Sequence, residues 1–144
     1  MSAGAGDSES HQQAARLGFE TGTVVQELGW DEDVDNDLRA AVEARTGAEM
    51  VDGDVGDVVD AVLLWWRDGD GDLVDALVDA LTDLAEGGLI WLLTPKVGLD
   101  GHVDPADIAE AAPVAGLSTT TSQQTSPGWA ATRLVTPKAD RKYR

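Results

Sequence analysis

The sequence predicts a single α/β domain in which helices cover both faces of a mostly parallel sheet. The first observation is that the two most apolar short segments, residues 61–66 and 89–93, are separated by an amphipathic segment with clear start and stop signals. A crossover of this length joins parallel strands. The second observation is that residues 61–66 do not alternate between apolar and polar, which is typical of a strand buried on both faces. A chain of 144 residues fits one such domain.

The N-terminal third predicts a strand, a helix and a second, short strand. Residues 1–17 are small and polar, and we expect a mobile leader in which a short helix could form. Residues 22–29 are rich in β-branched and apolar side chains and predict the first strand. Three acids and then apolar residues at four-residue spacing predict a helix over residues 33–46, which ends at Gly47. Residues 48–51 predict the short strand.

The centre of the chain predicts the crossover helix and the strand after it. Leucines recur on one face over residues 73–84 while acids occupy the other face, and Gly87 and Gly88 then stop the helix. Residues 89–94 predict the next buried strand, and Pro95 ends its pairing.

The C-terminal part predicts one more helix and a hairpin. Asp104 is an N-cap directly before a proline, which predicts a helix over residues 105–112. Residues 117–125 and 129–136 are separated by a Ser-Pro-Gly turn, and turn chemistry this short predicts an antiparallel hairpin.

The charge of the chain is unevenly distributed. Residues 1–132 contain 26 acidic and 5 basic side chains, whereas residues 133–144 have a net charge of +4. We therefore expect a domain over residues 18–136 and a basic mobile tail over residues 137–144. An acidic body repels the phosphate backbone, so nucleic acid is not an expected partner. Alternatively, the acidity only provides solubility or salt tolerance.

Other features of the sequence indicate where in the cell the protein lies and which cysteine-dependent sites it lacks. No apolar segment approaches the roughly 20 residues of a membrane span, and the N-terminus lacks the pattern of a signal peptide, so we expect a cytoplasmic protein without a membrane partner. The chain has no cysteine, which excludes disulfides and thiolate metal sites. The expected partner is another protein, and a homo-oligomer is also compatible with the sequence.

The order of these elements resembles a shortened class I methyltransferase fold, which is a three-layer Rossmann-like fold. Residues 24–29 resemble its first strand, with Gly29 at the start of the cofactor loop, and residues 60–66 resemble the strand across the crevice. The resemblance implies a strand order of about 2-1-3-4-6-5, counted along the predicted strands. It also implies that the first strand and the strand at residues 61–66 are parallel neighbours at the centre of the sheet.

A second resemblance covers nearly the whole chain. The motifs are ELGWDED at residues 27–33, VLLWWR at residues 62–67, WLLTPK at residues 91–96 and AEAAPVAGL at residues 109–117. On these motifs the chain is identified as a member of an actinobacterial domain-of-unknown-function family of about this length. That family implies no established activity.

The loop after the first strand does not suit the cofactor of the methyltransferases. Enzymes that use S-adenosylmethionine need glycines there, so that the backbone can approach the cofactor, and only Gly29 is kept. Trp30 and the acids at residues 31–33 follow it. A dinucleotide also needs open backbone at this position. We therefore predict no bound cofactor and no binding of S-adenosylmethionine at physiological concentrations.

Two acidic segments resemble the start of a calcium loop. In the segment that begins at Asp68, positions six and twelve are Leu73 and Asp79 rather than glycine and glutamate. The segment that begins at Asp31 fails the same test, so helix capping is the favoured role of both. Whether a metal binds is left open. His102 has no identifiable partner residue and is expected to be a surface loop residue.

The candidate site lies where strand order reverses, because ligands of open α/β folds bind outside the carboxyl ends of the strands at that point. The loops that leave the first strand and the strand at residues 61–66 are rich in acids, and like charges so close favour a cation. We expect this edge to receive a divalent metal, a basic partner segment or the chain's own tail from Lys138. The candidate residues are Gly29, Trp30, Asp31, Asp33, Arg67, Asp68, Asp70 and Lys96.

Two functions are consistent with this site. The favoured one is a non-catalytic interaction or regulatory module on a degenerate methyltransferase-like fold. The alternative is a small-molecule- or metal-binding enzyme of the same fold. Trp30 is expected either to be an exposed contact anchor or to plug the crevice, and an open crevice beside it distinguishes the two functions.

Overall fold

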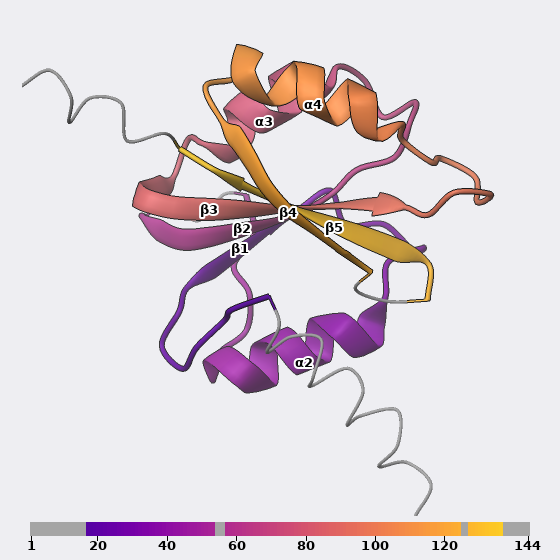
Figure 1. Ribbon diagram of the computed structural model, residues 1–144. Helices are drawn as coiled ribbons and strands as arrows, with labels where there is room; N and C mark the ends of the chain where they lie inside the picture. Colours follow the sequence, from indigo (N-terminus) through magenta and orange to yellow (C-terminus); the bar gives the residue numbers. More distant parts are fainter. Residues whose placement is uncertain (1–16, 54–56, 125–126, 137–144) are drawn as a thin grey trace, which may run out of the picture.

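The computed structural model describes residues 17–53, 57–124 and 127–136. Within them the chain forms a five-stranded mixed sheet with strand order β1-β2-β3-β5-β4. Helix α2 covers one face of this sheet, and α3 and α4 cover the other (Figure 1). The three-layer α/β prediction is confirmed. In chain order the elements are β1 (Val25–Leu28), α2 (Asn36–Thr46), β2 (Val59–Trp65), α3 (Leu73–Ala80), β3 (Leu84–Pro95), α4 (Pro105–Val114), β4 (Ser118–Gln124) and β5 (Trp129–Val135).

Strand β2 is buried on both faces, as its continuous apolar sequence predicts. Ala61, Leu63 and Trp65 belong to the core cluster that contains the buried residues of α2. Val62 and Leu64 belong to the cluster with α3 and α4. Successive side chains of a strand point to opposite faces, so β2 supplies both cores.

Strands β1 and β2 are parallel neighbours, as predicted, with Val25 opposite Ala61. The predicted strand at residues 48–51 is reduced to a single parallel bridge between Val51 and Gln26. The Asp52 carbonyl accepts a hydrogen bond from the Gln26 side chain at 3.2 Å. When the strand at residues 48–51 is left out of the predicted order, the remaining order is the observed β1-β2-β3-β5-β4. As a consequence β1 lies at the edge of the five-stranded sheet, and its predicted central position is wrong.

Helix α3 is shorter than the leucine pattern predicts. It ends at Ala80, and β3 already begins at Leu84, which pairs with Val59. Leu84 fits the leucine pattern of the helix because it packs against the same core cluster as the leucines of α3, although it belongs to strand β3. Gly88 lies within β3, where an added Cβ would be only 2.8 Å from the Asp60 carbonyl oxygen. The glycine therefore permits a close strand contact and does not stop a helix.

The other element boundaries agree with the predictions to within a few residues. Helix α2 is capped by the Asp35 side chain and ends at Gly47, which has a left-handed φ of 88°. Helix α4 starts after Asp104 as predicted but continues past Pro113, because a proline so near the helix end removes few hydrogen bonds. Strands β4 and β5 form the predicted antiparallel hairpin.

The packed domain includes Leu17, which the sequence assigned to the leader. Leu17 is 2% exposed, and its carbonyl accepts a hydrogen bond from Trp91 Nε1 at 2.8 Å. The remaining predicted leader, residues 1–16, and the predicted tail, residues 137–144, lie outside the described residues. In the described part of the chain, each helix is too short or too polar to cross a membrane.

Candidate functional site

The candidate site lies at the carboxyl ends of β1 and β2, the pair at which the covering helices change from one face of the sheet to the other (Figure 1). This is the position at which open α/β sheets bind ligands. Gly29 follows β1 with a φ of 78°, and a Cβ added there would lie 2.1 Å from the Trp65 carbonyl oxygen. Only glycine fits this contact. The backbone at the end of β1 is therefore packed directly against the end of β2.

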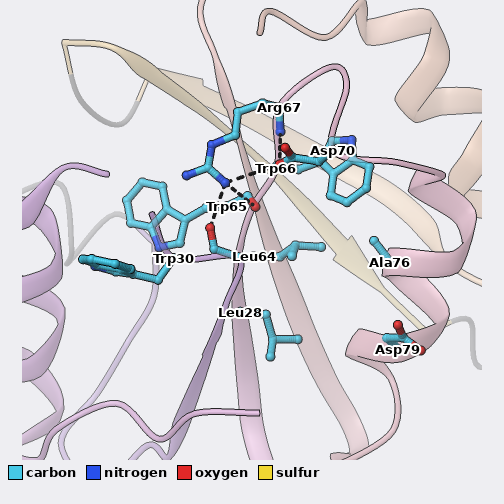
Figure 2. Close-up of a pocket in the computed structure, with 10 residues that line it drawn as sticks. Leu28, Trp30, Leu64, Trp65, Trp66, Arg67, Asp70, Ala76 and Asp79 are labelled. Atoms are coloured by element: carbon cyan, nitrogen blue, oxygen red, sulfur yellow. Dashed lines mark hydrogen bonds and ion pairs between the residues drawn. The ribbon is translucent and has the colours of Figure 1, made fainter. Parts of the chain in front are cut away.

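Arg67, just after β2, connects the loops that follow the two strands. Its Nε and Nη2 donate to the two carboxylate oxygens of Asp33 at 2.9 and 2.5 Å. Its Nη1 donates to the Gly29 carbonyl at 2.7 Å and is 3.3 Å from Asp70 Oδ2. In Figure 2, dashed lines mark the hydrogen bonds and the ion pair that Arg67 makes with other residues of the site. We call Arg67, Asp33, Asp70 and the Gly29 carbonyl the Arg67 cluster.

The Arg67 cluster is supported by aromatic side chains from the sheet. The guanidinium carbon lies 5.3 Å from the centre of the Trp129 ring, a distance suited to a cation–π contact. Trp129 packs edge-on against Trp65 at 4.8 Å, and its Nε1 donates to the Asp33 carbonyl at 3.3 Å. The Arg67 side chain is only 13% exposed. The arginine is thus fixed in place by both loops and by the sheet.

The hydrogen bonds between Arg67 and Asp33 shift the pKa values of both side chains. The bidentate hydrogen bond from Arg67 lowers the pKa of Asp33 below its ordinary value. The same contact raises the pKa of Arg67. Arg67 therefore compensates the charge of two acids at this edge, Asp33 and Asp70.

A second charged pair lies beneath the site, on the α2 face of the sheet. Glu27 of β1 has a side chain that is 9% exposed and accepts hydrogen bonds from Arg39 at 2.5 and 2.7 Å. It also accepts one from Trp65 Nε1 at 2.9 Å. The pKa of Arg39 is raised, chiefly by its hydrogen bond to Glu27. Our sequence analysis missed this pair, although an acid in an apolar strand that precedes an arginine-bearing helix is a usable signal.

A pocket of about 410 Å³ opens beside Trp30 (Figure 2). Trp30 is 54% exposed, so it lines the crevice without plugging it. We call this space the Trp30 pocket. It is lined by Leu28, Gly29, Trp30, Leu64, Trp65, Trp66, Arg67, Asp70, Ala76 and Asp79.

The structure gathers some of the predicted site residues and separates others. Gly29, Trp30, Arg67 and Asp70 line the Trp30 pocket, and Asp33 joins them through Arg67. Three further candidates, Asp31, Asp68 and Lys96, do not line it.

Each of these three residues has a different environment. The Asp31 side chain accepts a hydrogen bond from the Glu32 amide at 2.7 Å. The Asp68 backbone N–H donates to the Gly101 carbonyl at 2.8 Å. Lys96 directly follows β3, where its backbone N–H donates to the Gly128 carbonyl at 3.1 Å. Fewer of the candidate residues therefore surround the pocket than the sequence suggested.

Strand β5, the last strand before the predicted tail, runs away from this edge. It is antiparallel to β3, with Trp129 opposite Pro95 and Val135 opposite Leu89. Strand β5 therefore ends opposite the middle of β3, whereas the Trp30 pocket lies at the carboxyl ends of β1 and β2.

Two other acids of these loops serve local structure. Asp35 caps α2 by accepting hydrogen bonds from two amides of its first turn, and Asp72 caps α3 by accepting one. Within the described ranges, no group of three or more acidic or histidine side chains is arranged to hold a metal ion. His102 is half-buried in its loop, with Nδ1 3.0 Å from the Pro95 carbonyl oxygen.

Several solved structures with a similar fold are methyltransferases. The chain superposes with a TM-score of 0.54 on magnesium protoporphyrin IX methyltransferase from Synechocystis, at 12% identity, over 92% of this chain and 78% of that one. It superposes with a TM-score of 0.58 on a SAM-dependent methyltransferase from Aquifex aeolicus, at 11% identity and 89% of each chain. Identities this low show a shared methyltransferase-like fold and nothing more.

The chain belongs to the family described as "Protein of unknown function (DUF3052)", whose model matches residues 14–138. It is 57% identical over 126 residues to an uncharacterized protein of Mycobacterium tuberculosis, Rv2239c, over 88% of this chain and 79% of that one. The predicted family and its actinobacterial membership are therefore confirmed.

Proposed function

We propose that this protein is a non-catalytic binding module on a degenerate methyltransferase-like fold. The observation that carries the proposal is the Arg67 cluster. It joins the two loops between which such a fold binds its cofactor, and it uses the Gly29 carbonyl and the Asp33 carboxylate to do so. A site whose loops are held together by internal ion pairs does not present the open backbone that a cofactor needs.

The residues present do not fit S-adenosylmethionine. The backbone at Gly29 is packed against Trp65, and the bulky Trp30 follows where the methyltransferase loop has further glycines. Arg67 could have paired with the carboxylate of the cofactor, but it is already bound to two carboxylates and a carbonyl. We therefore derive no methyl-transfer step for this chain.

Trp30 suits a module that couples a ligand to a partner. It lines the pocket and is also 54% exposed, so a ligand and a partner surface can both contact it. Exposed tryptophans frequently anchor protein–protein contacts. The partner in this proposal is another protein, since the acidic surface disfavours nucleic acid.

The alternative function, a small-molecule enzyme of the same fold, is supported by one observation. The crevice beside Trp30 is open, and its volume of about 410 Å³ lies within the range of small-molecule sites. A substrate could therefore enter, although the carboxylates that line the pocket are the only acid–base groups there among the described residues.

Isothermal titration calorimetry with S-adenosylmethionine separates the two functions. The proposal predicts no saturable heat up to about 1 mM cofactor, and the same result with S-adenosylhomocysteine. A dissociation constant in the micromolar range for either compound would overturn it and favour the enzyme.

A further inference from the structure

The Trp30 pocket has a largely apolar interior between two tryptophans. Leu28 and Leu64 come from neighbouring parallel strands, and Ala76 adds a methyl group from α3. Trp30 and Trp66 flank this apolar surface on opposite sides (Figure 2). The volume of about 410 Å³ is at the lower end of the range for small-molecule sites, so the body of a ligand must be compact.

The charged groups of the pocket are unbalanced. Asp70 and Asp79 both line it, and the one basic residue among its described lining residues is Arg67. The charge of Arg67 is already compensated by Asp33 at 2.5 Å and by Asp70 at 3.3 Å. Asp79 lies on the exposed side of α3, and its carboxylate makes no hydrogen bond or ion pair within the described part of the chain. A ligand in the pocket therefore meets an uncompensated negative charge.

This combination selects for one chemical class. An anionic ligand would face Asp79 without a free cation to bind it, and in a molecule of net charge −17 the wider field also opposes it. An ammonium group can pair with Asp79, while a flat apolar body covers the two leucines. We infer that the Trp30 pocket binds a small organic ammonium ion with a compact, flat apolar body.

The inference rests on the proposed function, because it treats the pocket as a recognition site whose ligand is not chemically changed. It adds the class of ligand and the residue, Asp79, that selects the charge. The helix pattern alone had placed Asp79 on a solvent face, and the structure brings it to the wall of the pocket.

The test uses three matched probes of one shape: phenethylamine, the neutral 2-phenylethanol and the anionic 3-phenylpropanoate. Binding to the full chain is followed by the indole N–H signals of Trp30 and Trp66 in NMR spectra. We expect these probes to bind with dissociation constants of about 1 mM. Phenethylamine should shift both indole signals and bind about 3- to 5-fold tighter than the alcohol, and the anion should bind most weakly.

Two variants on the same helix locate the charge effect. Asp79→Asn should weaken phenethylamine about 3- to 5-fold and leave 2-phenylethanol unchanged. Asp75→Asn is the matched control, because Asp75 is an exposed aspartate of α3 that does not line the pocket, and it should change neither probe. Both positions are exposed, so both variants should fold.

The inference is wrong if the neutral or anionic probe binds as tightly as the amine, if the two variants behave alike, or if phenethylamine at about 10 mM shifts neither indole signal. Failure of the proposed function has a different signature. In that case S-adenosylmethionine binds in the micromolar range, whatever the order of the three probes.

Discussion

Replacing Arg67 by alanine should destabilise the domain by about 3 kcal/mol, because this one side chain connects two loops and covers a tryptophan. The ion pair with Asp33 contributes about 1 kcal/mol, since the Asp33 side chain is 52% exposed and solvent screens it. The hydrogen bond to the Gly29 carbonyl contributes about 1 kcal/mol, and the contact with Trp129 about the same.

The assay is urea or guanidinium unfolding followed by tryptophan fluorescence. For a domain of this size the expected loss corresponds to roughly 10 °C in melting temperature. Arg67→Lys keeps the charge but loses the bidentate geometry and should lose about half as much stability. Arg133→Ala is the matched control. Among the described residues the Arg133 side chain donates only to Thr120, on an exposed part of the hairpin, so its loss should change stability by less than about 0.5 kcal/mol.

The reasoning is refuted if Arg67→Ala costs no more than Arg133→Ala. That result would mean that the hydrogen bonds to Asp33 and Gly29 do not contribute to the free energy of unfolding in solution. The loops after β1 and β2 would then be free to separate.

Three further predictions concern neighbouring groups. Gly29→Ala should cost more than about 3 kcal/mol or prevent folding, because its Cβ would meet the Trp65 carbonyl at 2.1 Å, whereas Gly98→Ala, with positive φ but open space, should cost about 1 kcal/mol in the same unfolding assay. Glu27→Gln should cost about 2 kcal/mol because Arg39 loses its carboxylate, and a loss below about 0.5 kcal/mol would count against the pair. The pKa of Asp33 is lowered in the folded state, so its contribution to stability is present above the unfolded pKa and is lost as pH falls through the folded value; unfolding curves from pH 7 to pH 2 should show the advantage of wild type over Asp33→Asn shrinking below about pH 4.

The sequence was sufficient for the parts of the fold that depend on local patterns. The continuous apolar segment before Arg67 predicted a strand buried on both faces. The C-cap Gly47 of α2 and the N-cap Asp104 of α4 were also readable, because both depend on local sequence. The N-cap of α2 is Asp35, two residues after the predicted helix start. The end of α3 was not readable. Leu84 can pack against the same core from a helix or from a strand, and only its pairing with Val59 shows that it belongs to a strand.

The site could be located from the sequence, but its chemistry could not be assigned. The switch point follows from strand order, and Trp30, Arg67 and Asp70 were placed there correctly. The partners of Arg67 depend on the register between β1 and β2, since Asp33 lies 34 residues away in the chain. An excess of acids suggested a positively charged partner, and the structure pairs two of these acids, Asp33 and Asp70, with Arg67.

In the proposed function, the Arg67 cluster joins the two loops between which a methyltransferase-like fold binds its cofactor, and so closes that position. The most direct test is a crystal structure of the full chain grown with S-adenosylmethionine at about 5 mM. The account predicts that Arg67 still contacts Asp33 and the Gly29 carbonyl, with no cofactor between the ends of β1 and β2. Cofactor density beside Gly29, with Arg67 displaced from Asp33, would contradict it.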